Sequence, residues 1–262
     1  MMMLKDKVAV IYGAGGAIGG AVARAFASEG ANVFATGRIL APVEAVANDI
    51  ASTGGSAVAT EVDALDEKAI DAHLQSVIDK AGRIDISFNA VGIPNTEILG
   101  RPLVELDAEK FSLPITAYMT SYFLTARLAA RRMIANKSGV IMTVTAIPAR
   151  TGTPLNGGYG SALAAKEALT RDLSVELAPE GIRVVNLRPH GMPETPMIEG
   201  LHEIKAPKIT YEQFKEYLSG MSHSKRVMKL MELTNLAVFM ASDKASGMTG
   251  TTVNLTMGSV AD

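Results

Sequence analysis

Residues 8–19, Val-Ala-Val-Ile-Tyr-Gly-Ala-Gly-Gly-Ala-Ile-Gly, decide the fold. The first five are apolar or aromatic and mainly β-branched, which predicts a short strand covered on both faces. A helical pattern then runs from about Ile18 to Glu29 and stops at Gly30. A strand, a glycine-rich turn and a helix in this order indicate an α/β fold with helices packed on a parallel sheet.

The same alternation continues along the whole chain. No linker, low-complexity tract or internal repeat divides residues 1–262, so we predict one domain, a doubly wound parallel sheet of the Rossmann type. The irregular stretch 189–224 is expected to form a lobe that covers the substrate. Further strands are predicted near Asn32–Thr36, Ala57–Val62, Ile84–Asn89, Gly139–Thr145, Arg183–Leu187 and Thr252–Leu255, and helices over Glu67–Lys80 and Phe111–Met133.

Composition narrows the classes of function. Of the 262 residues, 48% are hydrophobic and 20% charged, which suits a large buried core. The net charge of −2 provides no field that would gather nucleic acid or an anionic membrane. Without cysteine there is no disulfide and no thiolate, and the four histidines lack metal-ligand spacing, so no metal is expected. Neither a signal peptide nor an apolar run of about 18 residues is present, so we expect a soluble cytoplasmic protein that acts on a small molecule.

The glycine-rich turn is expected to hold a pyrophosphate, because backbone amides at a helix N-terminus bind anions and a side chain would block their approach. The second predicted strand ends at Thr36-Gly37-Arg38, where an NAD site would offer an acidic residue to the ribose. Arg38 can instead meet a 2′-phosphate, which favours NADP(H). The expected contacts of the turn are Gly13, Gly15, Gly16, Ile18 and Gly19.

From Lys7 to about Gly258 the chain resembles the short-chain dehydrogenase/reductases. The turn resembles the family pattern Thr-Gly-x-x-x-Gly-Ile-Gly, with departures at Tyr12 and Ala17, and residues 167–184 follow the family's helix and next strand closely. The resemblance implies a homotetramer built on helices near 111–133 and 160–177. It also implies further cofactor contacts at Asp63 and Ala64 for the adenine, Asn89 and Gly92 for the ribose, and Pro189 and Thr195 for the nicotinamide.

The family's catalytic residues are mostly replaced. Counting back from Gly181, the catalytic Tyr falls on Tyr159, whereas the Lys falls on Leu163 and the Ser on Ala146. The structural Asn of the long helix falls on Tyr118, whose phenol either points into the site or fills the space of the Asn network. Without the Lys charge, the phenol is a poor base at neutral pH, so carbonyl reduction is favoured over alcohol oxidation.

A lysine, a histidine and a group of methionines lie outside this family pattern. Lys166 follows Tyr159 by seven residues, the separation found in enoyl-acyl-carrier reductases, but it conflicts with the register, so a solvated or interface lysine is the favoured interpretation. His190 lies where a nicotinamide-closing loop is expected, and we interpret it as a polar surface group rather than an acid–base catalyst. The methionines at 221, 228, 231 and 240 are assigned to helix core.

Two functions from different classes are consistent with these residues. The first is an NADP(H)-dependent oxidoreductase that reduces a small or medium apolar carbonyl or an activated alkene, with Tyr159 as proton donor and Tyr118 and Lys166 as further candidates. An enoyl-reductase-like enzyme using Tyr159 and Lys166 is a variant of it. The second is a catalytically impaired NADP-binding protein or sensor, which the missing Ser, Lys and Asn favour.

Overall fold

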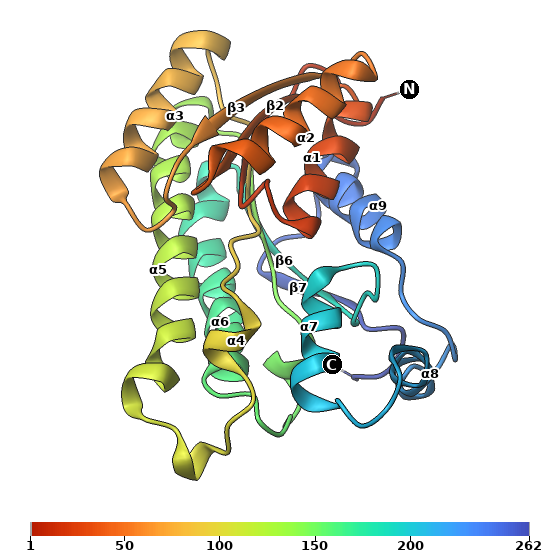
Figure 1. Cartoon of the computed structure of the whole chain (residues 1–262). Coiled ribbons are helices and arrows are strands. Elements are labelled where there is room, and N and C mark those ends of the chain that lie inside the picture. Colours follow the sequence, from red (N-terminus) through yellow and green to blue (C-terminus); the bar gives the residue numbers. More distant parts are fainter. Residues whose placement is uncertain (1, 262) are drawn as a thin grey trace.

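The computed structural model describes residues 2–261 and shows a seven-stranded, wholly parallel sheet in the order β3-β2-β1-β4-β5-β6-β7 (Figure 1). The strand order reverses between β1 and β4, and ligands bind beside the carboxyl ends of the strands at such a reversal. This confirms the predicted doubly wound sheet. The strands are β1 (Val8–Tyr12), β2 (Asn32–Gly37), β3 (Ser56–Glu61), β4 (Ile86–Asn89), β5 (Gly139–Val144), β6 (Ile182–Pro189) and β7 (Thr251–Leu255).

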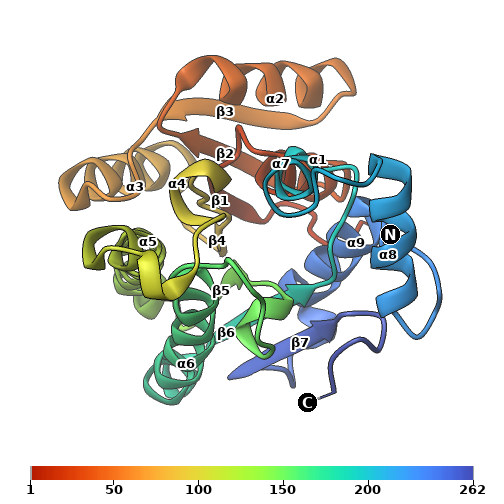
Figure 2. The ribbon, with the colours of Figure 1, turned by 60° about the horizontal axis from the view of Figure 1, so that its bottom comes forward.

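Helices cover both faces of the sheet, as Figure 2 shows for α3, α5 and α6 on one side and α1 and α9 on the other. Two buried apolar clusters, one on each face, hold these layers together. The helices are α1 (Ala17–Ser28), α2 (Leu40–Ser52), α3 (Glu67–Ala81), α4 (Asn95–Ile98), α5 (Ala108–Met133), α6 (Tyr159–Leu177), α7 (Pro196–Lys205), α8 (Tyr211–Met221) and α9 (Leu230–Ala241). Short 3₁₀ turns lie at Leu103–Glu105, Ile134–Asn136, Ile147–Ala149, Ala178–Glu180 and Asp243–Ala245.

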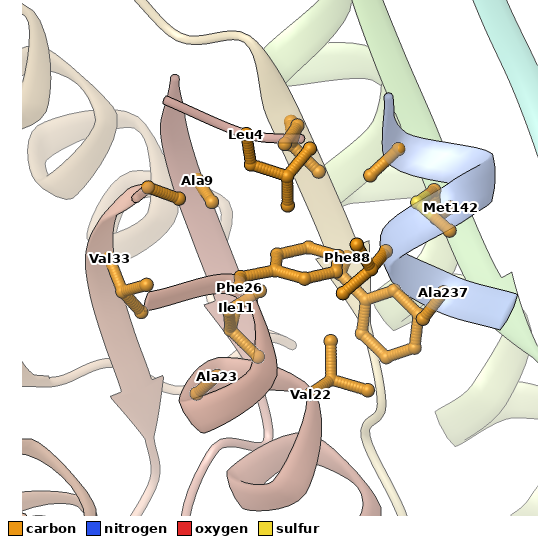
Figure 3. Close-up of a cluster of buried hydrophobic side chains, with 14 of the residues drawn as sticks. Leu4, Ala9, Ile11, Val22, Ala23, Phe26, Val33, Phe88, Met142 and Ala237 are labelled. Atoms are coloured by element: carbon orange, nitrogen blue, oxygen red, sulfur yellow. The ribbon is translucent and has the colours of Figure 1, made fainter. Parts of the chain in front are cut away.

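Close packing fixes α1 against the strands that carry the glycine-rich turn (Figure 3). The ring of Phe26 on α1 meets that of Phe88 on β4 edge to face, with centroids 6.4 Å apart. Both side chains are completely buried, and such burial contributes roughly 1.5–3 kcal/mol for each ring. The position of the α1 N-terminus is therefore set by the core beneath it.

The stretch 189–224 contains α7 and α8, which share a small core of Ile198, Phe214 and Leu218. The assignment of four methionines to helix core is mostly wrong. Met240 is buried on α9, and Met228 is buried in the loop before α9. Met221 and Met231 are 41% and 62% exposed, because they lie on outward faces of α8 and α9. Among residues 2–261, none of the helices combines the length and the apolar character needed to cross a membrane.

Candidate active site

The glycine-rich turn between β1 and α1 is shaped so that side chains are excluded from it. Gly13 has a φ of 76°, and a Cβ there would lie 2.6 Å from the carbonyl oxygen of Ala90. A Cβ at Gly19 would lie 2.2 Å from the carbonyl oxygen of Gly13. The N-cap, Gly16, makes no side-chain hydrogen bond, and the first turn of α1, all of it in the described chain, carries no acidic residue. The backbone amides there fit the pyrophosphate of a dinucleotide.

The carboxyl ends of neighbouring strands bring the other expected cofactor contacts to the same edge. Gly37, at the end of β2, lies beside the turn: a Cβ on it would stand 3.9 Å from the amide nitrogen of Gly15. The next residue, Arg38, is exposed. Asp63 accepts a hydrogen bond through Oδ1 from the amide of Leu65, at 2.9 Å. These positions fit the adenosine half of a dinucleotide.

The ribose segment after β4 is held by a buried amide. Asn89 donates from Nδ2 to Thr125 Oγ1 at 3.1 Å and accepts from the amide of Val91 at 3.4 Å. The side chain of Asn89 thus shapes the segment rather than projecting from it. Gly92 follows this segment, and a Cβ at Gly92 would meet open space. Ala64, which was expected to contact the adenine, lies after β3 and is buried.

Two phenols meet where α6 begins. The ring centroids of Tyr159 and Tyr118 are 5.8 Å apart, and the planes are tilted by 58°. The Tyr118 hydroxyl accepts a hydrogen bond from the amide of Ile93 at 3.4 Å, and the Tyr159 hydroxyl lies 3.9 Å from Met197 Sδ on α7. Burial raises the pKa of both phenols, and the proximity of Tyr118 raises that of Tyr159 further. Both are therefore neutral at pH 7, able to donate a proton but poor as bases.

Lys166 is only 1% exposed, so its interpretation as a solvated or interface lysine is wrong. Its Nζ donates to the carbonyl oxygen of Val144 at 3.0 Å and lies 5.7 Å from the ring centroid of Tyr118 and 5.6 Å from that of Tyr122. Burial lowers the pKa of Lys166 to about 7. The two aromatic faces of α5 explain why a lysine is accommodated here, since aromatic faces attract a cation. Leu163, in the register of the family lysine, is buried.

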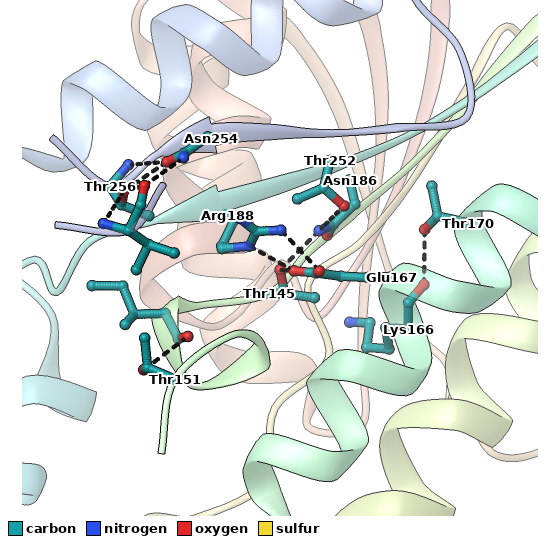
Figure 4. A network of polar contacts seen from close by, with 12 residues as sticks. Thr145, Thr151, Lys166, Glu167, Thr170, Asn186, Arg188, Thr252, Asn254 and Thr256 are labelled. Carbon is teal, nitrogen blue, oxygen red and sulfur yellow. Dashed lines mark hydrogen bonds and ion pairs between the residues drawn. The ribbon is translucent and has the colours of Figure 1, made fainter. Parts of the chain in front are cut away.

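A buried polar network lies between the end of β5, β6 and α6 (Figure 4). Arg188 donates to Glu167 through Nε and Nη2, at 2.8 and 2.9 Å, and both side chains are almost fully buried. Glu167 also accepts from Thr145 Oγ1 at 3.0 Å, and Asn186 Nδ2 donates to the same hydroxyl at 2.8 Å. Thr145 directly precedes Ala146, so the network fixes the backbone at the position of the family serine.

Sequence reasoning missed this network. Its members come from positions as far apart as Thr145 and Arg188, which only the packing of α6 on the sheet brings together. One signal was available: Asn186 and Arg188 are polar residues two positions apart in a strand with apolar neighbours, and polar groups inside a covered strand require partners.

The loop after β6 also differs from expectation. His190 is 2% exposed, so its interpretation as a surface group is wrong. Its amide donates to the carbonyl oxygen of Leu255, which continues the pairing of β6 with β7 and draws the ring inward. Nδ1 lies 3.3 Å from the carbonyl oxygen of Gly191, and Nε2 has no partner among the described residues. Pro189 is buried, and Thr195 donates to the carbonyl oxygen of Met192 at 2.8 Å.

Comparison with known proteins agrees with this arrangement. A family model described as Enoyl-(Acyl carrier protein) reductase matches residues 13–259. The oxidoreductase YxbG of Bacillus subtilis is 31% identical over 250 residues, which cover 95% of this chain and 89% of that protein. The 7alpha-hydroxysteroid dehydrogenase of Escherichia coli K12 is 27% identical, over 99% of this chain and 96% of that protein.

Solved structures show the same similarity. A short-chain type dehydrogenase/reductase from Mycobacterium marinum superposes with a TM-score of 0.88 at 28% identity, covering 100% of this chain and 98% of the other. Sorbitol-6-phosphate 2-dehydrogenase SrlD from Erwinia amylovora gives 0.90 at 28% identity, covering 97% and 100%. The fold and the nucleotide cradle define an oxidoreductase that uses a nicotinamide cofactor. The chain belongs to the short-chain dehydrogenase/reductase family.

Proposed function

We propose that the protein is an NADP(H)-dependent reductase of carbonyl compounds or activated alkenes, with Tyr159 as the proton donor. The observation that carries this proposal is the neutral phenol of Tyr159 at the start of α6, beside Tyr118 and under Met197 of α7. A phenol with a raised pKa holds its proton until the substrate oxygen becomes basic, which suits reduction better than oxidation.

The residues present fit NADP(H). The uncapped N-terminus of α1 and the turn at Gly13 would hold the pyrophosphate, and Arg38 would hold the 2′-phosphate. Asp63 would accept from the adenine amine, and Gly92, Pro189 and Thr195 would border the ribose and nicotinamide. When bound, the cofactor supplies the hydride, and the protein binds, orients and excludes water.

Within the proposed site, both phenols would donate hydrogen bonds to the substrate oxygen. Tyr159 donates the proton. Tyr118 accepts from Ile93 and so keeps its own hydroxyl proton free, which makes it a second donor where Ala146 offers none. Donors aimed at a developing oxyanion stabilise the transition state. Lys166 lies against the Tyr118 ring, and in its protonated form it would act on the substrate oxygen through that phenol.

One observation favours a different class of function. Ala146 and Leu163 stand at the family's serine and lysine positions, and Leu163 is packed into the interior. A protein that binds NADP(H) without turnover, as a sensor or an inert subunit, is the alternative that these two positions support.

The two functions are separated by following NADPH absorbance with a panel of ketones, aldehydes and enones. The reductase proposal predicts consumption with at least one compound class and a loss of about 10²–10⁴-fold in Tyr159→Phe with unchanged NADPH affinity. NADPH binding without consumption across the panel supports the sensor instead.

A further inference from the structure

Lys205, the last residue of α7, joins that helix to the loop that begins the active-site helix. Its Nζ donates to Asn156 Oδ1 at 2.9 Å. The carbonyl oxygen of Asn156 in turn accepts from the amide of Tyr159 at 3.1 Å. Met197, near the start of α7, lies against the Tyr159 hydroxyl. Helix α7 therefore forms a wall from the reacting phenol to Lys205, which lies at the opposite end of the helix.

Lys205 carries a charge that no residue among 2–261 neutralises. Over residues 2–261 no carboxylate forms an ion pair with it, and Asn156 is its one side-chain partner. Partial burial lowers the pKa of Lys205 to about 8, so the amine is still protonated at pH 7. An ammonium has three donor hydrogens, and the contact with Asn156 uses one of them. A half-buried cation with unused donors favours an anionic ligand.

Asn156 adds a second donor at the same place. The residue is 9% exposed, and its Oδ1 is engaged by Lys205. Its Nδ2 makes no hydrogen bond within the described part of the chain. The two side chains thus offer nitrogen donors beside the loop residue that lies three positions before Tyr159.

We propose that the substrate carries a carboxylate at the end remote from its reacting carbonyl, and that Lys205 and Asn156 bind it. This inference rests on the proposed reductase function for the identity of the reacting end. One cation and one amide match a single negative charge better than a dianionic phosphate. The eight residue steps from Met197 to Lys205 span about 12 Å along α7. The lysine side chain leans toward the helix N-terminus, which shortens the distance from its amine to Met197. The apolar surface at Met197 faces the reacting end.

Binding measurements test the inference without requiring turnover. Straight-chain keto carboxylates of increasing length, each paired with its methyl ester, are titrated calorimetrically into the protein with and without NADPH. We expect one chain length to bind about tenfold or more tightly as the acid than as the ester. Lys205→Met and Lys205→Gln should abolish that difference, Lys205→Arg should retain most of it, and the exposed Lys208→Met is the matched control.

Equal binding of acid and ester, or binding of neither, overturns the inference. An equal loss of affinity for both forms in Lys205→Met would show that Lys205 only holds α7 in place. Tight acid binding that depends on Lys205, without NADPH consumption, would leave the carboxylate site intact and contradict the reductase function alone.

Discussion

The ammonium nitrogen of Lys166 lies over the ring of Tyr118, 5.7 Å from its centroid. The lysine comes from α6 and the tyrosine from α5, where the family places an asparagine that orients a different lysine. Leu163 stands in the register of the family lysine, and Lys166 lies about one helical turn further along α6. The Tyr118 ring contacts both the Lys166 amine and the ring of Tyr159.

Replacing Lys166 by Met should separate its stability effect from its catalytic effect. Because the amine is buried without a carboxylate partner, an apolar side chain of similar volume should leave stability unchanged or raise it by about 1–3 kcal/mol. The reduction rate should fall about tenfold, with NADPH affinity unchanged. Urea unfolding and steady-state kinetics measure the two effects, with exposed Lys110→Met as control. A parallel loss of stability and rate would assign Lys166 a structural role.

Removing the Tyr118 hydroxyl tests its role as a second donor. Tyr118→Phe keeps the ring beside Tyr159 but leaves the Ile93 amide unpaired, at a cost to stability of about 1 kcal/mol. We expect kcat of Tyr118→Phe to fall by about tenfold, because this variant lacks one hydrogen-bond donor. The kcat of Tyr159→Phe should fall far more, because that variant lacks the proton source. Unchanged kcat in Tyr118→Phe would restrict this side chain to packing.

Cofactor choice depends on Arg38. Arg38→Ala should weaken NADPH binding by about 10–100-fold, since a charge-assisted contact to phosphate contributes about 1.5–3 kcal/mol. NADH has no 2′-phosphate, and its affinity should change little. Calorimetric titration of both cofactors into both proteins measures the four dissociation constants. Equal affinity of the unmutated protein for NADPH and NADH would contradict the assignment.

The sequence predicted the arrangement of the fold better than the surroundings of individual charges. Glycine spacing and the alternation of strands and helices located the turn at Gly13, and register placed Tyr118 and Tyr159 in one site. The burial of Lys166 and His190 was not predicted, because a charged or polar residue next to an active-site loop is usually solvated. Their burial depends on rings and strands that approach from distant parts of the chain.

Acid should destabilise the protein through His73. This side chain on α3 is 6% exposed with neither ring nitrogen partnered among the described residues, and burial lowers its pKa from 6.5 to about 4. Between these pH values the unfolded chain binds the proton more readily than the folded protein. The contribution of His73 to the free energy of unfolding is therefore fully present above pH 6.5. It decreases by about 3 kcal/mol as the pH falls to about 4.

Urea unfolding at a series of pH values measures this dependence, and His73→Leu should flatten the part of the curve due to the imidazole. If the variant follows the same curve as the unmutated protein, other groups account for the acid sensitivity.

The family resemblance implies a homotetramer that forms through the outer faces of α5 and α6. Val175 on α6 is 78% exposed and Phe123 on α5 is 41% exposed, so both helices present apolar side chains outward. Val175→Glu should place a charge in a four-helix contact and shift the mass toward a smaller species. Light scattering at micromolar concentration measures this, and a monomeric mass for the unmutated protein would contradict the assembly.

The most direct test of the reductase assignment is isotope transfer from NADPH deuterated at the reactive carbon of the nicotinamide. We expect deuterium on the reduced carbon of the product with the unmutated protein, and transfer slowed about 10²–10⁴-fold in Tyr159→Phe with NADPH still bound. Tight NADPH binding with no deuterium in any product of a carbonyl and enone panel would contradict it.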